Sequence, residues 1–263
     1  MKTNILLFIR GGFKLTHIIY NTNVGSNKPN TLVNKDYKCP FCDRENLRKE
    51  GHILRETNEF LIVKNKFPVL KDSDPAVVVE HNSCNEHIGT YSVEYLERLL
   101  SFCLNYYEDL QKTGSYKSIA FFKNHGIFSG GSIQHPHMQI IGFHNNTYEV
   151  NNDEFSGVTI LSNQSIEWNF SNKPKSEFFE INLTLKNKEQ LNEFCAYLQK
   201  SVQFILQVLN TKYQCYNLAF QIEEDRIRVK IISRGPTSIL LLGFGIHQTP
   251  NNVEELAAQL RDF

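Results

Sequence analysis

The sequence has no excess of charge of either sign and no long hydrophobic run. Its 263 residues contain 28 Lys and Arg against 28 Asp and Glu, so the formal net charge is zero. No cluster of Lys and Arg indicates attraction to nucleic acid or to an anionic membrane surface. The longest apolar run, residues 239–246, is too short to span a bilayer. We therefore expect neither a nucleic-acid polymer nor a membrane as a partner.

Low-complexity segments and long linkers are also lacking, and the length suffices for one large domain or two small ones with a substantial core. The apolar run at 5–9 is too short for the hydrophobic region of a signal peptide. Residues 10–14 could be encoded by a purine-rich stretch that resembles a ribosome-binding site. We therefore interpret residues 1–14 as an extension of a natural chain that starts at Leu15; an ordinary N-terminal segment is the alternative.

Cysteine is scarce, and most of it carries no spacing signal. Cys103 and Cys195 fall inside helical patterns and are expected to be small core residues. Without a signal peptide a disulfide framework is the poorer interpretation, and the cytoplasm is the expected location. There, the C-x-x-C of Cys39 and Cys42 indicates a metal knuckle or a redox pair. The preceding loop favours metal over a redox helix, but two further ligands are needed.

The pattern of strands and helices repeats along the chain. In the first part, two strands are followed by an amphipathic helix at 92–112, with Ser92 as its N-cap, and by a hairpin at 120–143. In the second part, a strand at 178–185 is followed by a long helix at 188–209 and another hairpin at 216–232. The pattern predicts an α+β fold built as a tandem of two related units, each an antiparallel sheet with a long helix. The expected segments are an N-terminal arm (1–36), a first unit (37–150) and a second unit (151–263).

The stretch from 121 to 143 concentrates polar residues that a core strand does not need. Glycines punctuate a turn, and the segment after it contains His135, His137 and Gln139 at alternating positions. Alternating residues of an extended strand share one face, so these three side chains are expected to align. Backbone N–H groups of a glycine loop can cradle a phosphate. A polar strand edge with chance histidines is the alternative.

Three motifs in this stretch resemble the active-site signature of the galactose-1-phosphate uridylyltransferase family: Asn124-x-Gly126, Gly131-Ser132 and His135-Pro136-His137-x-Gln139. That family is a branch of the histidine-triad superfamily and includes nucleotide phosphorylases. The resemblance implies that His137 attacks the α-phosphorus of a nucleotide and forms a nucleotidyl-histidine. It also implies that Gln139, a neutral amide, favours transfer over hydrolysis. The expected substrate-contacting residues are Asn65, Phe67, Asn124, Gly130, Gly131 and Ser132; a loop amide and a core phenylalanine are the alternative for the first two.

The resemblance further implies one structural zinc ion. Its expected ligands are Cys39, Cys42, His87 and His135, where His87 opens an H-x-x-T segment. Four such ligands suit a closed tetrahedral site. His81 and Cys84 stay open as replacements. A second metal is not expected, because the matching strand of the second unit, residues 226–230, contains no histidine.

The function expected from the resemblance is nucleotidyl transfer from a nucleoside diphosphate sugar or related nucleotide, in a homodimer. Gly245 stands where the family carries the glutamate that reads the hexose, which argues against galactose 1-phosphate as the acceptor. Two alternatives remain. One is a phosphorylase or hydrolase of sugar nucleotides or dinucleoside polyphosphates. The other is a catalytically inactive zinc-containing protein that binds nucleotides.

Overall fold

The computed structural model of this chain describes residues 18–34, 36, 38–148, 151–176, 179–237, 241 and 247–263. The expectations for residues 1–14 and for Gly245 lie outside these ranges. Within them, no helix combines the length and the apolar character that crossing a membrane requires.

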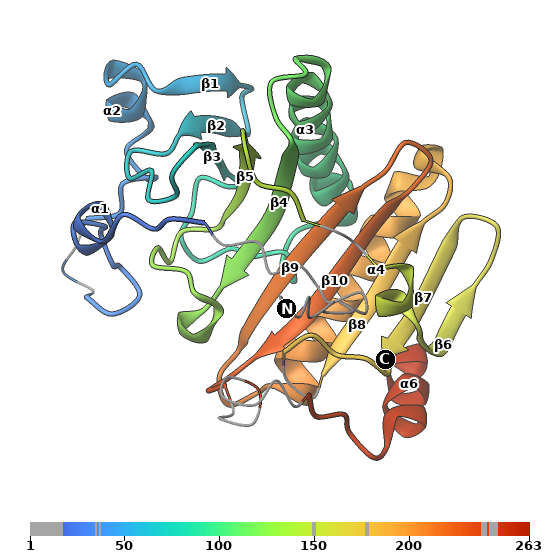
Figure 1. Cartoon of the computed structure of the whole chain (residues 1–263). Coiled ribbons are helices and arrows are strands. Elements are labelled where there is room, and N and C mark those ends of the chain that lie inside the picture. Colours follow the sequence, from blue (N-terminus) through green and yellow to red (C-terminus); the bar gives the residue numbers. More distant parts are fainter. Residues whose placement is uncertain are drawn as a thin grey trace, which may run out of the picture.

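A single antiparallel sheet runs through the described part of the chain (Figure 1). Its strand order is β1-β2-β3-β5-β4-β9-β10-β8-β7-β6. The strands are β1 (Ile53–Glu56), β2 (Leu61–Lys64), β3 (Ser73–Val79), β4 (Ser118–His125), β5 (His137–Phe143), β6 (Gly157–Ser162), β7 (Ile166–Ser171), β8 (Glu180–Leu185), β9 (Cys215–Ile222) and β10 (Ile227–Arg234).

The two halves of this sheet have the same internal order. Read from either edge inward, five strands follow the pattern first, second, third, fifth, fourth. Each half inserts one long helix between its third and fourth strands. These helices are α3 (Val93–Lys112) and α4 (Leu191–Phe204), the latter continued by a π-helical turn at Ile205–Leu209. The expected tandem of α+β units is therefore confirmed. The two sheets are not separate, however, because β4 pairs with β9 and joins them.

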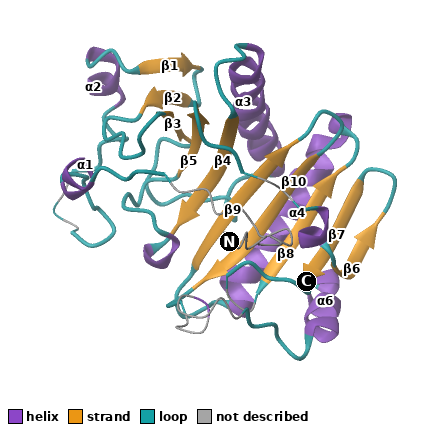
Figure 2. Cartoon of the chain, in the orientation of Figure 1, coloured by secondary structure: helices purple, strands orange, loops and turns teal. Residues whose placement is uncertain are grey.

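The main core lies between the sheet and the two long helices, α3 and α4, which cover one of its faces (Figure 2). Ser92 caps α3 as expected, since its side chain accepts a hydrogen bond from the Tyr95 backbone N–H at 3.1 Å. At the centre of the sheet the rings of Phe121 on β4 and Phe220 on β9 stack with centroids 4.3 Å apart. The last helix, α6 (Val253–Asp262), packs on β6 and β7. The helix-facing residues thus form one continuous core across both halves.

The opposite face of the first half carries a smaller apolar cluster. Leu61, Val63, Val77 and Val79 of the sheet pack there against Leu47 of α2 (Arg44–Lys49). The N-terminal arm, with the short helix α1 (Thr22–Ser26), approaches from the same side. Further short helices in the described part of the chain are η1 (Ile127–Ser129), η2 (Asn152–Phe155) and η3 (Lys188–Gln190). Strands of this half are therefore covered on both faces, which explains the continuous apolar run at 76–79.

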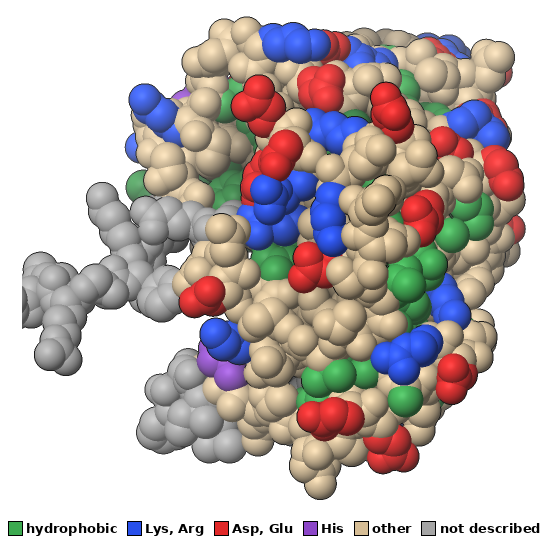
Figure 3. Space-filling model, turned by 90° about the vertical axis from the view of Figure 1, so that its right-hand side faces the viewer, with side chains coloured by type: hydrophobic (Ala, Val, Ile, Leu, Met, Phe, Trp, Pro, Cys, Tyr) green, Lys and Arg blue, Asp and Glu red, His purple; other side chains and the backbone are tan. Residues whose placement is uncertain are grey.

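The corresponding face of the second half is filled by polar side chains. Arg228 and Lys230 of β10 are only 5% and 3% exposed. Arg228 pairs with Glu223, and Lys230 Nζ lies 2.6 Å from Glu180 Oε1. On the surface of the molecule seen in Figure 3, basic and acidic side chains alternate, in agreement with the zero net charge.

Candidate functional site

Three cysteines and one histidine converge next to the start of β5. The ligand atoms of Cys39, Cys42, Cys84 and His135 all lie within 4.8 Å of one another. The His135 Nδ1 atom is 3.5 Å from the Cys39 sulfur, 3.6 Å from that of Cys42 and 3.2 Å from that of Cys84. Among the described residues, this is the group of three or more such side chains that could hold a metal ion.

The imidazole of His135 is oriented for ligation. Its Nε2–H donates a hydrogen bond to the His81 carbonyl oxygen at 2.7 Å. Because a carbonyl only accepts, this bond fixes the proton on Nε2 and leaves the Nδ1 lone pair directed at the three sulfurs. Such a bond on the far ring nitrogen is the usual support of a metal-bound histidine.

The donor set fits zinc. One histidine and three thiolates match the tetrahedral Cys₃His sites that bind Zn²⁺. Burial, followed by the neighbouring thiols of Cys42 and Cys39, raises the pKa of the Cys84 thiol. A divalent cation reverses this effect, because it stabilises thiolates at short range. The four residues are thus consistent with one zinc ion.

His87 does not join this group. Its Nδ1 accepts a hydrogen bond from the Gly89 backbone N–H at 3.1 Å, and its ring lies 5.3 Å from the ring of His125. The position expected for His87 is taken by Cys84, which the sequence left open as a replacement. The segment 81–87 offers three candidate ligands, and only its turn geometry determines which one faces Cys39 and Cys42.

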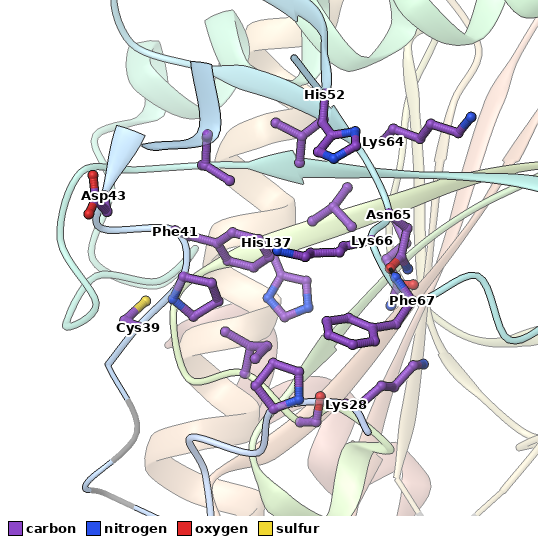
Figure 4. A pocket seen from close by; sticks show the side chains of 18 of the residues that line it. Lys28, Cys39, Phe41, Asp43, His52, Lys64, Asn65, Lys66, Phe67 and His137 are labelled. Atoms are coloured by element: carbon purple, nitrogen blue, oxygen red, sulfur yellow. Dashed lines mark hydrogen bonds between the residues drawn. The ribbon is translucent and has the colours of Figure 1, made fainter. Parts of the chain in front are cut away.

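A cavity of about 470 Å³ opens beside the metal cluster (Figure 4). The sequence-predicted residues that line it are Cys39, Asn65, Phe67, Gly130, Gly131, Ser132, His137 and Gln139. The imidazole of His137 lies between the rings of Phe41 and Phe67 in this view. The Phe41 ring is 5.6 Å from that of His137 and 5.8 Å from that of His135. Phe41, inside the C-x-x-C, thereby connects the cluster to the cavity.

The His137 side chain presents one free ring nitrogen. Its Nδ1–H donates to the His135 carbonyl oxygen at 2.8 Å, which leaves the lone pair on Nε2. Burial is the main cause that lowers the pKa of His137 to about 4. A neutral imidazole with an unblocked Nε2 is a competent nucleophile. β5 begins at His137, so His135 stands just before the strand, in the cluster with Cys39, Cys42 and Cys84, while His137 and Gln139 line the cavity.

The glycine loop between β4 and β5 reaches the same cavity. Gly130 has a φ of 86°, a left-handed conformation that favours glycine. Gly126 has a φ of 86° too, and a Cβ there would meet the Cys215 sulfur at 2.3 Å. The N-terminal arm holds the loop, because the Thr31 backbone N–H donates to the Ser132 carbonyl at 2.9 Å. The loop therefore presents backbone along one wall of the cavity.

Two expected substrate residues already use their side-chain oxygens in hydrogen bonds within the protein. Asn124 lines a second cavity, of about 310 Å³, and its side-chain oxygen accepts from Asn217 Nδ2 on β9 at 2.7 Å. The Asn65 oxygen accepts from the Phe67 backbone N–H at 2.8 Å, which shapes the N-x-F-P turn. In this conformation Asn124 connects the two halves of the sheet, while Asn65 keeps Phe67 in the cavity wall.

The sequence did not predict the basic side chains that line the cavity. Lys28, Lys38, Lys64, Lys66 and His52 line it together with two acidic side chains, Asp43 and Glu50. Both acids already face lysines: Glu50 Oε1 is 3.0 Å from the Nζ of Lys66, and Asp43 Oδ2 is 3.4 Å from that of Lys38. These lysines are scattered along the sequence and form no basic run, so no local pattern announced them.

Comparison with known proteins identifies the family of this chain. The profile described as "Domain of unknown function (DUF4931) N-terminal domain" matches residues 20–146, and that of the corresponding C-terminal domain matches residues 147–263. The chain belongs to the DUF4931 family. A crystal structure of a DUF4931 family protein from Bacillus cereus is 36% identical, with a TM-score of 0.72 over 80% of this chain and 98% of that one.

More distant structures share the fold. An ADP-glucose phosphorylase from Arabidopsis thaliana with bound ADP-glucose is 15% identical, with a TM-score of 0.67 over 87% of this chain and 91% of that chain. A uridylyltransferase structure is 15% identical, with a TM-score of 0.64 over 88% and 94%. None of the curated proteins matches. These likenesses confirm, at the level of the fold, the resemblance to galactose-1-phosphate uridylyltransferases.

Proposed function

We propose that this DUF4931 protein is a nucleotidyltransferase that works through a covalent nucleotidyl-His137 intermediate. The observation that carries the proposal is the His137 imidazole, which directs a free Nε2 into a cavity shared with a glycine loop. The fold, common to uridylyltransferases and an ADP-glucose phosphorylase, supports it. The donor we propose is a nucleoside diphosphate sugar or a related nucleotide.

The chemistry proceeds in two displacements. In the first, Nε2 of His137 forms a bond to the α-phosphorus, and the bridging oxygen leaves with its electron pair as part of the departing phosphate. In the second, a phosphate oxygen of the acceptor attacks the same phosphorus and releases the imidazole. Each displacement concentrates negative charge on the phosphoryl oxygens, which fixed donors must stabilise. We assign this role to the backbone at Gly130 and Gly131, to Ser132 and to the amide of Gln139.

The basic lining supports a substrate with more than one phosphate. Lysine side chains around the cavity outnumber its acidic ones, although the whole chain is neutral. Lys28 is half-buried, and burial lowers its pKa, so an anionic ligand would gain from reaching it. Phe41 and Phe67 offer apolar surface for a nucleoside. A phosphorylase reaction shares the first displacement and differs only in taking inorganic phosphate as acceptor.

We also propose that Cys39, Cys42, Cys84 and His135 hold one structural zinc ion. Zinc there would supply no reacting group. It would connect the C-x-x-C loop, which carries Phe41, to the residue two positions before the nucleophile. This arrangement keeps the cavity wall and the catalytic strand in one rigid unit.

Intact mass spectrometry after incubation with UDP-, ADP-, GDP- and dTDP-sugars tests the proposal. The expected result is a mass increase of one nucleoside monophosphate, mapped to the His137 peptide and absent from His137→Ala. Discharge of this adduct by hexose 1-phosphates or by inorganic phosphate then separates transfer from phosphorolysis. Donor turnover that continues unchanged in His137→Ala would contradict the covalent mechanism.

A homodimer is part of the proposal, by resemblance to the transferase family. Light scattering at micromolar concentration is expected to give twice the chain mass. A monomer would remove the dimer and leave the rest of the proposal unaffected.

A further inference from the structure

A buried charge pair lies directly behind the nucleophile, and the chemistry above does not use it. Lys123 on β4 is 1% exposed, and Glu80, which follows β3, is fully buried. Their Nζ and Oε1 atoms are 2.5 Å apart. A buried ion pair often stabilises a fold no better than apolar residues of the same volume, because both charges lose their hydration. Fold stability alone therefore does not explain why a buried ion pair lies at this position.

The lysine replaces a missing hydrogen bond of the sheet. The pairing of β4 with β5 ends at Phe122 and Gln139, whereas β4 continues to pair with β9 as far as His125. The two strands thus separate just before the nucleophile, and the His137 carbonyl has no ladder partner on β4. Lys123 Nζ donates to that carbonyl at 3.2 Å.

The glutamate is itself held from two sides. Its side chain accepts from the Tyr91 hydroxyl at 3.0 Å, and its backbone carbonyl accepts from the Tyr95 hydroxyl at 2.7 Å. Its backbone N–H donates to the Pro136 carbonyl at 3.1 Å. The position of the ammonium is therefore set by the start of α3 and by the backbone that precedes the nucleophile.

We propose that Lys123, oriented by Glu80, is a positioning residue that fixes the backbone of His137 where the strands part. The inference rests on the proposed function, because it concerns the alignment of Nε2 with the α-phosphorus. Lys123 acts through His137 and does not contact the substrate. A displacement of a reacting atom by about 1 Å can lower a rate by about 100-fold.

The second half of the molecule contains a matched control. Lys230 Nζ and Glu180 Oε1 are 2.6 Å apart, and these side chains are 4% and 0% exposed. Lys230 also donates to Asn182 Oδ1 at 2.9 Å and to the Glu154 carbonyl at 2.5 Å. This pair has the same chemistry and the same burial, and His137 is not among its hydrogen-bond partners.

The experiment compares two double variants, Lys123→Met/Glu80→Gln and Lys230→Met/Glu180→Gln. The first readout is the single-turnover rate of adduct formation at saturating donor, with the donor Kd measured separately. The second is the rate at which diethyl pyrocarbonate carbethoxylates His137, followed by peptide mass spectrometry. This second readout needs no nucleotide. Zinc content and circular dichroism confirm that each variant is folded.

We expect adduct formation to slow by about 10- to 100-fold in the Lys123/Glu80 variant, with the donor Kd changed by less than about 3-fold. Carbethoxylation should become faster, because the buried His137 ring is no longer held in place and a small reagent reaches it more readily. The Lys230/Glu180 variant should lose stability and keep both rates. Equal rates in the two variants would overturn the proposal and leave the first pair a merely structural one. If wild type forms no adduct while carbethoxylation still distinguishes the variants, the proposed function fails and the positioning role stands.

A milder pair of single variants tests the positioning role of Lys123 if a double variant does not fold. Glu80→Gln leaves the ammonium in place without its anionic partner, and Glu180→Gln does the same in the second half. Carbethoxylation of His137 is expected to be faster than in wild type in Glu80→Gln alone, because the buried ring is less firmly held. The same rate in both single variants would overturn the proposal.

Discussion

The two halves of this protein share one strand order and differ in what covers the face opposite the long helices. In the first half, β5 places His137 and Gln139 at a cavity of about 470 Å³. In the second half, β10 places Arg228 and Lys230 under η2, where Phe155 covers both cationic groups at 4.6 and 4.5 Å from its ring centroid. One face is open with a free imidazole nitrogen; the other is filled with paired charges.

This difference shows that the two halves of a duplicated fold can take different roles, one carrying the candidate site and the other holding it in place. The second half buries its polar groups in a network of hydrogen bonds, as when Asn182 Nδ2 donates to Asn169 Oδ1 at 2.9 Å. Such a network specifies one packing, because its polar groups are hydrogen-bonded to one another. The first half keeps its proposed metal ligands and its cavity on loops that extend from the sheet. We infer that the second half serves as a scaffold on which β9 holds β4 and the glycine loop.

The largest expected effect comes from removing the proposed nucleophile, His137. His137→Ala should lower the rate of donor turnover by on the order of 10⁴-fold or more, because a covalent nucleophile provides much of the rate enhancement. Zinc content and the unfolding midpoint should change little. Stopped assays with the donor identified by adduct formation measure the loss.

The matching change in the second half is Arg228→Gln on β10. It removes the ion pair with Glu223 and the hydrogen bond to Asn152, and it should lower stability while sparing the rate. A comparable loss of turnover in both variants would remove the functional distinction between the halves.

The next largest effect concerns the metal. Cys84→Ser should lose zinc and lower the thermal midpoint by on the order of 10 °C, because a structural metal contributes its binding free energy to folding. Cys215→Ser, a buried cysteine of β9 outside the cluster, should retain the metal. Elemental analysis of purified protein measures both.

His87→Ala should also retain zinc, since His87 hydrogen-bonds to Gly89 and lies outside the cluster. Full zinc in Cys84→Ser together with metal-free His87→Ala would restore the ligand set expected from the sequence.

Much of the first half could be predicted from its sequence because its signals are local. The period of α3, its Ser92 cap, the glycines of the loop and the signature around His137 each depend on residues close together in the chain. The tandem arrangement followed from the order of such signals. β6 and β7 were not predicted, although Asn163 between them forms a turn in which its side-chain oxygen accepts from the Ser165 and Ile166 backbone N–H groups.

The remaining features depend on tertiary contacts that no local pattern encodes. Cys84 replaces His87 because of how the 81–87 turn folds against the C-x-x-C loop. Asn124 turns to Asn217 because β4 and β9 pair across the two halves. Arg228 and Lys230 are buried because η2, some 75 residues earlier, covers them. The basic lining of the cavity likewise assembles from four separate segments.

A smaller effect should follow from changing the amide of the cavity. Gln139→His replaces a neutral amide by a group that can exchange protons with water. Hydrolysis of the donor, relative to transfer, is expected to rise by about 100-fold, the low end of what a positioned acid or base contributes. The ratio of free to transferred nucleotide, measured with labelled donor, checks this. An unchanged ratio would mean that the amide does not restrain water.

The smallest expected effect lies where the two halves meet. His125 of β4 pairs with Tyr216 of β9, and their rings stack with centroids 4.7 Å apart. Burial, then the charge of Lys123, lowers the pKa of His125 to about 3, below its ordinary value of about 6.5. Between these two values the unfolded chain binds a proton that the folded chain does not. The neutral His125 therefore costs the folded state nothing above about pH 6.5, and the free energy of unfolding decreases as the pH falls below that value.

His125→Gln should reduce the loss of unfolding free energy between pH 7.5 and 5.5 by up to about 1 kcal/mol, the value for one such proton. Urea titrations at both pH values, with zinc present, measure it. Protonation of the metal ligands lowers stability in wild type and variant alike, so the difference between them isolates His125. Tyr216→Phe keeps the stacked ring and the histidine, and should keep the wild-type pH dependence. If His125→Gln also keeps it, the junction between the halves does not hold His125 in its neutral form.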